Sequence, residues 1–396
     1  MPEREKVALC LEYPIEQFGG TEVLVRQLIH GLAGRYRIVL VSPDNEAAVK
    51  ASSVAGKVEQ HLFWDPARIS AAGSRRLAQA IADSGVRLAH FHFAGNYGWG
   101  NRYFNRCPVL FLGPLGVTCL STNHGAFSIF DGYCGPQRSV LIKGGYFLPA
   151  WFSKLRVLSR LKTEIAVSQN DYRSLRRWYW PLRSKFGQIY HSQLQLKESD
   201  EATILPAADR EKVIICVGTI GLRKGQNILT EAFSRIAAEF PDWKLLLIGR
   251  HGDDGVIDRV KAIIAERNLS QQVLLLNKCS DEEVKGWMKK AAVFAMPSYL
   301  EGLGLSLQEA QFNCCACVGS RVGGIPELIE HEKTGLLVEP GQPGALADAL
   351  KTLISNPALR ESYGRSGRKA VIEKGMTAGQ MIARYVELYE SLFSAR

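Results

Sequence analysis

Hydrophobic residues along the chain fall into two kinds of run that alternate. Short runs rich in Val, Ile and Leu are typical of buried strands, and longer stretches with an apolar residue every three or four positions are typical of amphipathic helices. Residues 6–13 and 36–42 predict strands on either side of a helix at residues 21–34. Further strand-like runs lie at residues 86–93, 108–113, 118–122 and 164–168. Alternating strands and helices predict a parallel sheet that is covered by helices on both faces.

The same alternation resumes after residues 195–211, a polar and charged stretch with little periodicity that we interpret as a linker. Predicted strands lie at residues 212–220, 243–249, 272–277 and 292–298. Predicted helices lie at residues 227–240, 257–268, 281–291, 306–313, 343–355, 357–373 and 377–393. The predicted fold class is therefore α/β, with two Rossmann-like doubly wound domains that face each other across a cleft. Because ligands of such sheets bind beyond the carboxyl ends of the strands, we expect the functional site in that cleft.

The composition favours a soluble globular protein, since hydrophobic residues make up 46% and charged residues 22% of the chain. No run approaches the ~18 apolar residues of a membrane span, and the N-terminal residues do not form a secretory signal. The nine cysteines are odd in number and lack paired spacing, which favours reduced, buried thiols over disulfides or a zinc site. We therefore expect a cytoplasmic protein.

The positive charge of the chain is confined to one half. Residues 1–199 carry 25 basic and 14 acidic residues, a net charge of +11, whereas residues 200–396 carry a net charge of −1. The excess of positive charge is densest at residues 138–185. This stretch contains 11 basic and two acidic residues, and aromatic residues lie between the arginines. Such a surface suits an anionic partner, namely membrane phospholipids, lipid diphosphates or nucleic acid. The alternative is a solvated basic helix face.

Two loops between a predicted strand and a predicted helix could bind an anion. The sequence FGGTE places Gly19 and Gly20 at the start of the first helix, where free backbone N–H groups face outwards. It lacks the GxGxxG spacing of a dinucleotide-binding motif. An ordinary turn between a strand and a helix could have the same sequence. The sequence VGTIGLRKGQN places Arg223 and Lys224 beside another helix start, which favours a phosphate grip over an exposed basic turn.

A third loop, SYLEGLGLSLQEA, carries two glutamates around a glycine-broken turn. Gly302 and Gly304 free the N–H groups of this turn to face an anion. Glu309 lies about one turn into the next helix, where its carboxylate can accept hydrogen bonds from the paired hydroxyls of a ribose. Glu301 precedes the turn and would meet the other end of the same ligand. Two acids and a phosphate-binding loop together fit a sugar nucleotide.

Between residues 213 and 340 the order of these motifs resembles that of glycosyltransferase family 4, a group of retaining sugar transferases with the GT-B fold. The match includes LLIGRHGD, GSRVGGIPELI and TGLLVEPG, together with the family's two glutamates separated by seven residues, here Glu301 and Glu309. The first half matches more loosely, in FGGTE, NHG and IAVSQND. Two positions depart from the family's pattern. Thr219 stands where the family often has Arg, and His191–Ser192 replaces its usual Asn–Gly.

The resemblance implies a role for each matched position. Glu309 would hold the donor ribose, Glu301 would lie near the donor sugar and its phosphate, and Lys224 with Arg223 would neutralise the diphosphate. His124 would contact the donor sugar near the reacting carbon. The candidate catalytic residues are therefore His124, Lys224 and Glu301. The implied donor-binding residues are Gly19, Gly20, Gly218, Thr219, Arg223, Lys224, Gly302, Gly304, Leu305 and Glu309.

The resemblance also implies an organisation and a reaction. Residues 1–195 would form the acceptor-side domain, residues 212–375 the nucleotide-sugar domain, and residues 376–396 a helix that returns to the first domain. The enzyme would be a metal-independent, retaining hexosyltransferase that uses a UDP-, GDP- or ADP-sugar. The acceptor would be a sugar, a polysaccharide or a lipid-linked molecule in bacterial-type polysaccharide or glycolipid synthesis. Residues 138–185 could then dock the enzyme on the inner face of the membrane.

Other functions account for fewer of these features. A glycosidase that uses Glu301 and Glu309 as acid and nucleophile leaves Lys224 and the phosphate-type loops without a role. A nucleic-acid partner is not expected, because neither an RNP motif nor a helix-turn-helix is present. A non-catalytic module of the same fold, binding a nucleotide sugar or a membrane, is the alternative to the transferase.

Overall fold

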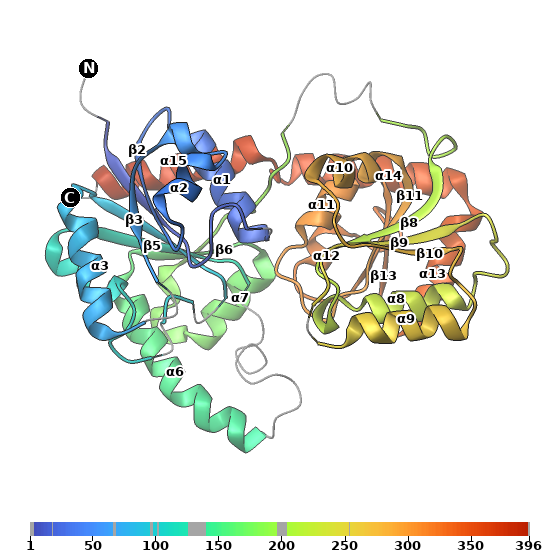
Figure 1. Ribbon diagram of the computed structural model, residues 1–396, viewed down its shortest axis with the longest axis horizontal. Coiled ribbons are helices and arrows are strands. Elements are labelled where there is room, and N and C mark those ends of the chain that lie inside the picture. Colours follow the sequence, from blue (N-terminus) through green and yellow to red (C-terminus); the bar gives the residue numbers. More distant parts are fainter. Residues whose placement is uncertain are drawn as a thin grey trace. The chain divides into compact units, whose positions relative to one another are not determined.

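Each half of the chain builds its own parallel β-sheet, and the two sheets belong to separate units of the computed structural model (Figure 1). The structure describes residues 4–17, 19–65, 69–95, 98–100, 103–125, 140–195, 204–252 and 254–394. The first unit comprises Met1–Gln193 and Ala378–Arg396, and the second comprises Leu194–Thr377. The α/β class with two Rossmann-like units is therefore as predicted.

The first unit contains a seven-stranded sheet with the order β3-β2-β1-β4-β5-β6-β7, and every strand pair is parallel. Its strands are β1 (Lys6–Cys10), β2 (Arg37–Ser42), β3 (Val58–Phe63), β4 (Leu88–Phe93), β5 (Thr118–Asn123), β6 (Thr163–Ala166) and β7 (Phe186–Gln188). The strand order reverses between β1 and β4. The loops that follow these two strands therefore lie at the position where doubly wound sheets bind ligands.

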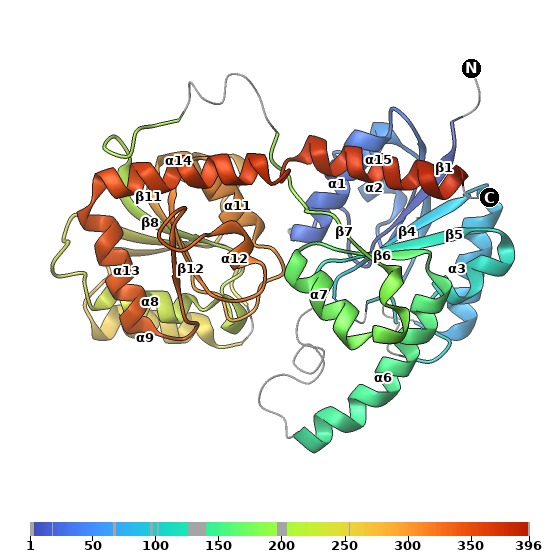
Figure 2. The ribbon, with the colours of Figure 1, turned by 180° about the vertical axis from the view of Figure 1, so that it is seen from behind.

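Helices cover both faces of this first sheet, as Figure 2 shows. They are α1 (Gly20–Leu32), α2 (Glu46–Ala51), α3 (Ala71–Asp83), α4 (Val109–Leu112), α6 (Val140–Arg160), α7 (Gln169–Trp178) and α15 (Ala378–Ser394). The last helix, α15, packs against α1 so closely that a Cβ atom on Gly31 would lie 2.3 Å from Cδ1 of Ile382. The final helix of the chain is thus part of the first unit.

The predicted strand at residues 108–113 is wrong. This segment forms the short helix α4, followed by a 3₁₀ turn at Gly113–Leu115. Pro108 and Pro114 bracket the run, and a proline lacks the N–H group that a strand in the middle of a sheet must donate. The apolar residues between the prolines are buried against the sheet instead of joining it.

The second unit contains a six-stranded parallel sheet with the order β10-β9-β8-β11-β12-β13. Its strands are β8 (Glu211–Val217), β9 (Lys244–Ile248), β10 (Val273–Leu276), β11 (Ala291–Met296), β12 (Ala316–Ser320) and β13 (Leu336–Val338). Its helices are α8 (Gln226–Ser234), α9 (Val256–Glu266), α10 (Asp281–Lys290), α11 (Leu305–Phe312), α12 (Ile325–Leu328), α13 (Pro343–Ser355) and α14 (Pro357–Glu373). The order reverses between β8 and β11, so their loops flank the ligand-binding position of this sheet.

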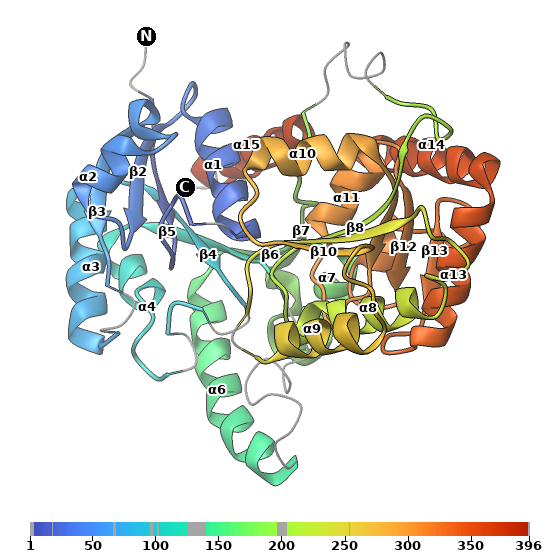
Figure 3. The ribbon, with the colours of Figure 1, turned by 45° about the vertical axis from the view of Figure 1, so that its right-hand side comes forward.

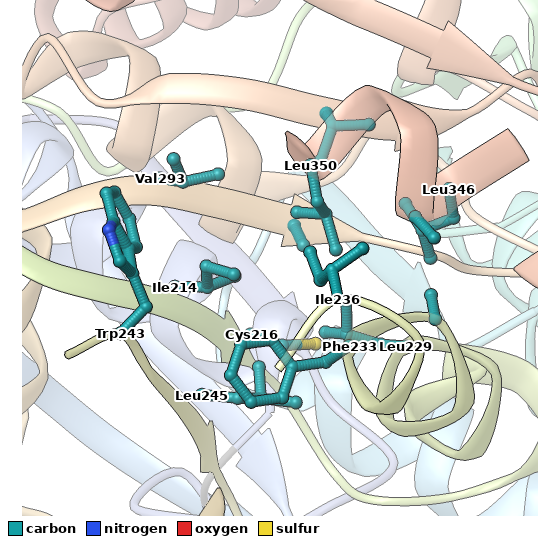
Figure 4. Close-up of a cluster of buried hydrophobic side chains, with 14 of the residues drawn as sticks. Ile214, Cys216, Leu229, Phe233, Ile236, Trp243, Leu245, Val293, Leu346 and Leu350 are labelled. Carbon is teal, nitrogen blue, oxygen red and sulfur yellow. The ribbon is translucent and has the colours of Figure 1, made fainter. Parts of the chain in front are cut away.

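A dense apolar layer joins the second sheet to the helices on one of its faces. Figure 4 shows Ile214 of β8 and Leu245 of β9 packed against Phe233 of α8 and Leu350 of α13. All four side chains are fully buried. Figures 1 and 3 show α10, α11 and α14 on the other face. A rigid sheet with both faces covered holds the loops at its carboxyl edge in fixed positions.

Three further observations bear on the sequence analysis. Within the described ranges, no helix is long and apolar enough to cross a membrane. The eight cysteines in the part of the chain that the structure describes form no disulfide, which agrees with the prediction of reduced thiols. The basic stretch at residues 138–185 spans α6, β6 and α7, and its first two residues lie outside the described residues.

Candidate active site

The loop after β8 carries Arg223 and Lys224, for which the sequence predicts phosphate binding. It begins at Gly218, where φ is +144°, and it ends at Gly225, where φ is +66°. A Cβ atom on Gly225 would lie 2.3 Å from the carbonyl oxygen of Pro297, the first residue after β11. The loops after β8 and β11 therefore touch backbone to backbone, and only glycine fits at this contact.

The side chains of Lys224 and Glu301 join the same two loops. Nζ of Lys224 lies 2.5 Å from Oε2 of Glu301, and the two side chains are 15% and 10% exposed. Burial raises the pKa of Glu301, but the charges of Lys224 and Arg223, with the hydrogen bond from Lys224, outweigh it, so that pKa lies below its ordinary value. Glu301 is thus ionised at neutral pH. A group that has already lost its proton cannot act as the general acid that a glycosidase needs, so this finding counts against that alternative.

Arg223 supports the pair from the first of these loops. Its backbone carbonyl accepts a hydrogen bond of 2.8 Å from the N–H group of Tyr299, which ties the loop after β8 to the loop after β11. Its side chain is exposed, and its charge contributes to the lowered pKa of Glu301. Arg223 and Lys224 therefore place two positive charges at the reversal point of the sheet, as the sequence predicted.

A glycine pair between β12 and α12 holds the loop of Glu301 from the other side. A Cβ atom on Gly323 would lie 1.8 Å from the carbonyl oxygen of Glu301, and one on Gly324 would lie 2.4 Å from that of Gly302. Gly304 ends the loop with φ of +96° and precedes the first turn of α11. The sequence RVGG thus has a structural role that its sequence alone did not reveal, because it lets two turns approach closely.

The first turn of α11 lies against the end of β8. The hydroxyl of Ser306 donates to the carbonyl oxygen of Val217 at 3.2 Å. Leu305 is the first residue of the helix and is half-buried. Glu309 lies four residues later, also half-buried, and its backbone carbonyl accepts hydrogen bonds from the N–H group and the side chain of Asn313. The free N–H groups of this helix start and the carboxylate of Glu309 thus belong to one short helix.

Gln226 was not singled out from the sequence, although it braces the loop after β8. Its side chain is buried, its Nε2 donates to the carbonyl oxygen of Thr219 at 3.2 Å, and its Oε1 accepts from the N–H group of Gly221 at 3.2 Å. Asp254 completes the support, because its Oδ2 accepts a 2.6 Å hydrogen bond from the N–H group of Leu222. A glutamine just after a glycine-rich loop was the only available signal for this role.

The remaining candidates lie in the first unit. Gly19 is the residue before α1, and a Cβ atom on it would lie 2.2 Å from Oε2 of Glu22, a buried carboxylate in the first turn of the helix. Gly20 begins the helix, and Phe18 of the same motif lies outside the described residues. A carboxylate at a helix N-terminus is stabilised by the helix dipole. The small size of Gly19 therefore makes room for Glu22.

His124 follows β5 directly, as predicted from NHG. Its backbone N–H group donates to the carbonyl oxygen of Phe93 at 3.0 Å, and its ring nitrogen Nε2 lies 3.0 Å from Nδ1 of His92. The ring is half-buried, and burial, followed by the neighbouring His191 and His92, lowers its pKa well below the ordinary value. His124 is therefore a neutral imidazole at physiological pH. Within the described residues, no group of three or more His, Cys, Asp or Glu side chains is arranged to hold a metal ion.

Comparisons with known proteins identify the family. The model described as "Glycosyltransferase Family 4" matches residues 18–190, and the model described as "Glycosyl transferases group 1" matches residues 198–370. This chain belongs to the family 4-like glycosyltransferases. The resemblance found in the sequence and the enzyme class it implied are thereby confirmed.

Known relatives of this glycosyltransferase include several bacterial enzymes. This chain is 26% identical over 388 residues to the alpha-maltose-1-phosphate synthase of Mycobacterium tuberculosis. The match covers 92% of this chain and 94% of that protein. It is 33% identical over 159 residues to the D-inositol 3-phosphate glycosyltransferase of Corynebacterium jeikeium, covering 39% of this chain and 38% of that protein. The first of these similarities extends over both units.

Solved structures show the same fold. The sucrose-phosphate synthase of Thermosynechococcus elongatus matches with a TM-score of 0.72 at 20% identity, over 99% of this glycosyltransferase and 100% of that chain. The Anabaena protein Alr3699/HepE, solved with UDP and glucose, matches with a TM-score of 0.74 at 15% identity, over 98% and 100%. The GT-B assignment is confirmed.

Proposed function

We propose that this glycosyltransferase moves a sugar from a nucleotide diphosphate donor to an acceptor hydroxyl with retention of the anomeric configuration. The observation that carries the proposal is the Lys224–Glu301 pair at the reversal point of the second sheet. Breaking the bond between the sugar and the diphosphate builds negative charge on the phosphate and positive charge on the sugar. A preorganised cation beside an ionised carboxylate matches that distribution of charge.

The ammonium group of Lys224 can serve both neighbours at once. It has three N–H donors, and one of them binds Glu301. The other two can bind phosphate oxygens, so the donor would add its charge without leaving Glu301 unpaired. Arg223 and the free N–H groups at the start of α11 would share the diphosphate. These groups can stabilise the leaving phosphate without a metal, and we propose metal-independent catalysis.

The donor-binding role falls to the second unit. Glu309 would hold the ribose hydroxyls, Glu301 would face the transferred sugar, and the loop from Gly218 to Lys224 would surround the diphosphate. In the first unit, Gly20 would approach the diphosphate and His124 the donor sugar. The donor class is a UDP-, GDP- or ADP-hexose, and the Anabaena protein of similar fold that was solved with UDP and glucose supports a nucleotide of this kind.

The proposed mechanism needs no protein nucleophile. The acceptor hydroxyl would approach from the side of the leaving group, and the departing phosphate would take its proton. In this arrangement the protein contributes charge stabilisation and positioning, which account for much of the rate acceleration in many enzymes. The alpha-maltose-1-phosphate synthase and the D-inositol 3-phosphate glycosyltransferase named above support a sugar-type acceptor, and we propose a sugar, polysaccharide or lipid-linked acceptor in bacterial-type polysaccharide or glycolipid synthesis.

The surface of α6 supports an acceptor at a membrane. Its side chains Leu141, Leu148 and Phe152 are 88%, 56% and 54% exposed, and Arg156 and Arg160 are exposed on the same helix. Figure 3 shows α6 extending beyond the other helices of its unit. Apolar side chains beside arginines suit the interface of an anionic bilayer. We propose that the enzyme is cytoplasmic and docks on the inner face of the membrane through this helix.

Vesicle flotation tests the docking proposal. Wild-type protein should float with vesicles that contain an anionic phospholipid and stay at the bottom with zwitterionic ones. The variant Leu148→Asp/Phe152→Asp should lose flotation. Phe63→Asp, at an exposed site on β3, should float like wild type and serves as the matched control. Equal behaviour with both kinds of vesicle would show that docking does not depend on lipid charge.

A donor screen tests the reaction itself. UDP-, GDP- and ADP-hexoses are added separately, and the unfolding temperature is measured for each. We expect one nucleotide to raise that temperature, since a ligand that binds only the folded state stabilises it. With that donor and a panel of acceptors, NMR of the product should show the anomeric configuration of the donor. An inverted product would refute retention, and binding without turnover on any acceptor would favour the non-catalytic alternative.

A further inference from the structure

Four histidines of the first unit lie together beside the carboxyl end of its sheet. His90 and His92 are on β4, His124 follows β5, and His191 follows β7. The ring centroid of His92 lies 4.1 Å from that of His90 and 5.3 Å from that of His124, and the centroid of His124 lies 5.1 Å from that of His191. Only His124 is more than marginally exposed. The sequence analysis assigned a role to His124 alone.

The ring of His90 is held at both nitrogens. Its Nδ1 lies 2.6 Å from the hydroxyl of Tyr389, and its Nε2 lies 2.8 Å from the hydroxyl of Thr122. The hydroxyl of Tyr385 extends this series of hydrogen bonds. It lies 2.8 Å from the hydroxyl of Thr122 and 2.8 Å from Nε2 of His191. His90 and His191 are thereby fixed by α15 and by β5. A hydroxyl can donate or accept a hydrogen bond, so this series of hydrogen bonds is compatible with either tautomer of each ring.

His92 differs from His90, because one of its nitrogens is buried without a hydrogen bond. Its Nδ1 lies 3.0 Å from Nε2 of His124, whereas its Nε2 has no hydrogen-bond partner in the part of the chain that the structure describes. The side chain of His92 is 0% exposed, so bulk solvent does not contact this atom. Burial also lowers the pKa of His92 well below the ordinary value of a histidine. Each of the two rings therefore carries one proton.

The contact between the two rings permits two arrangements of those protons. In one, His124 donates from Nε2, and the proton of His92 then lies on its buried Nε2, where it finds no acceptor. In the other, His92 donates from Nδ1, and its buried Nε2 carries only a lone pair. Buried N–H groups without a partner are rarer than buried acceptors without one. An unmade hydrogen bond at a buried donor carries the full desolvation penalty. The second arrangement is therefore favoured.

We propose that His92 is a positioning residue that holds His124 in the tautomer with its proton on Nδ1. Nε2 of His124 then accepts from His92, and the opposite nitrogen presents an N–H donor. No hydrogen bond in the described part of the chain engages Nδ1 of His124, so this donor is available to a ligand. The inference rests on the proposed contact of His124 with the donor sugar. It adds that this contact is a neutral N–H group that donates a hydrogen bond and keeps its proton.

The backbone around His124 is fixed from the opposite side. The N–H group of Gly125 donates to Oδ1 of Asn123 at 3.2 Å, and Nδ2 of Asn123 donates to Oε1 of Glu164 at 3.3 Å. Glu164 is fully buried and pairs with Lys154 at 2.6 Å. With its backbone held in this way, the ring of His124 is oriented, among the described residues, by its hydrogen bond to His92 and its edge contact with the ring of His191.

Nitrogen NMR of the full-length, ¹⁵N-histidine-labelled protein tests the tautomer without any substrate. The protein has eight histidines, and the signals of His92 and His124 are assigned from the variants His92→Phe and His124→Gln. We expect both rings to be neutral with the proton on Nδ1 and a bare Nε2. A proton on Nε2 of His124 would overturn the inference. In His92→Phe, the proton of His124 should move at least partly to Nε2, as in a free imidazole.

Kinetics test the consequence of the tautomer. Loss of the partner that orients a functional histidine costs about 10- to 100-fold in activity at metal sites, and we expect a fall in kcat of that order for His92→Phe with KM near wild type. His92→Asn should recover most of kcat, because its amide can donate from nearly the same position as Nδ1. Wild-type kcat in His92→Phe, or no recovery in a folded His92→Asn, would overturn the positioning role. An enzyme inactive with every donor would refute the proposed function, while the NMR result would still decide the tautomer.

Discussion

The pairing of Lys224 with Glu301 leads to a prediction that separates stability from catalysis. Replacing Lys224 with Met keeps the length of the side chain and removes its charge, which leaves a carboxylate that is only 10% exposed. At the observed 2.5 Å and an effective dielectric constant of about 20, the Coulomb attraction is ~7 kcal/mol, from which the desolvation of both groups is subtracted. Removing one partner of such a buried pair costs ~3–5 kcal/mol of the free energy of unfolding.

The pH dependence of this loss has a defined sign. In wild type the folded-state pKa of Glu301 is lowered, so the pair contributes stability above the unfolded-state pKa, and that contribution is lost as pH falls through the folded value. Without Lys224, the carboxylate of Glu301 loses a charge and a hydrogen bond that lower its pKa, so that pKa rises from its wild-type folded value. The variant therefore lacks the stability that the pair adds to wild type as pH rises. The difference between Lys224→Met and wild type should therefore be largest near pH 7 and should shrink below about pH 5.

Urea unfolding and steady-state kinetics measure the two effects separately. Adding Glu301→Gln to Lys224→Met removes the unpaired charge and should recover most of the lost stability. It should not recover kcat, which we expect to fall ~10²–10³-fold in both variants because a preorganised donor to the leaving phosphate is gone. Lys212→Met, which breaks an exposed ion pair with Asp242 in the same unit, should change neither quantity measurably. Wild-type turnover in a folded Lys224→Met protein would refute the assignment of Lys224.

Three further predictions concern donor binding, loop packing and the buried ion pair. Glu309→Gln should weaken the binding of the nucleotide sugar in calorimetry and leave urea unfolding unchanged, whereas equal affinity would exclude a ribose contact. Gly323→Ala should lower the free energy of unfolding by at least ~1–3 kcal/mol, because φ is +54° and the new methyl group would clash with the backbone carbonyl of Glu301. Gly286→Ala, inside α10 with open space around it, should instead stabilise by ~0.5–1 kcal/mol. Lys154→Met or Glu164→Gln alone should cost ~3–5 kcal/mol in urea unfolding, and the double variant should cost much less; additive losses would contradict a coupled pair.

The sequence was sufficient to predict which residues meet in the second unit, because their placement depends on local features. Arg223, Lys224 and Glu301 each lie within a few residues of the end of a strongly apolar strand. In a doubly wound sheet the two strands that flank the reversal point bring such loops together. Knowing which residues follow the strands was therefore sufficient to expect that they meet.

Three of the strands that the sequence did not predict give only a weak signal of their own. β3 lies at the sheet edge and carries Glu59, Gln60 and His61 in succession, so no alternation of polar and apolar residues is visible. β7 and β13 have three residues each, and they are strands only because a neighbouring strand supplies hydrogen-bond partners. Such pairing depends on residues far away in sequence, which a periodicity within the segment does not contain.

The contact between His92 and His124 could not be predicted from the sequence either. His92 and His124 are 32 positions apart. His92 lies on β4 and His124 directly follows the neighbouring strand β5, so their contact depends on the register of these two strands. The basic stretch shows the same limit. Lys154 counts towards its positive charge, yet its side chain is fully buried with Glu164 and contributes nothing to a surface. Charge counts along a sequence do not separate surface residues from buried pairs.

The protonation states in the two units favour one kind of chemistry over another. Glycosidases depend on a carboxyl group that is protonated when the leaving group departs, and their active sites raise its pKa to keep it so. Here the pKa of Glu301 is lowered and that of His124 is lowered as well, so the carboxylate has no proton to give and the imidazole is not a cation. Lys224 and the N–H group of His124 can each donate hydrogen bonds. That combination suits a reaction in which the leaving phosphate takes the proton of the acceptor and the protein stabilises its developing charge.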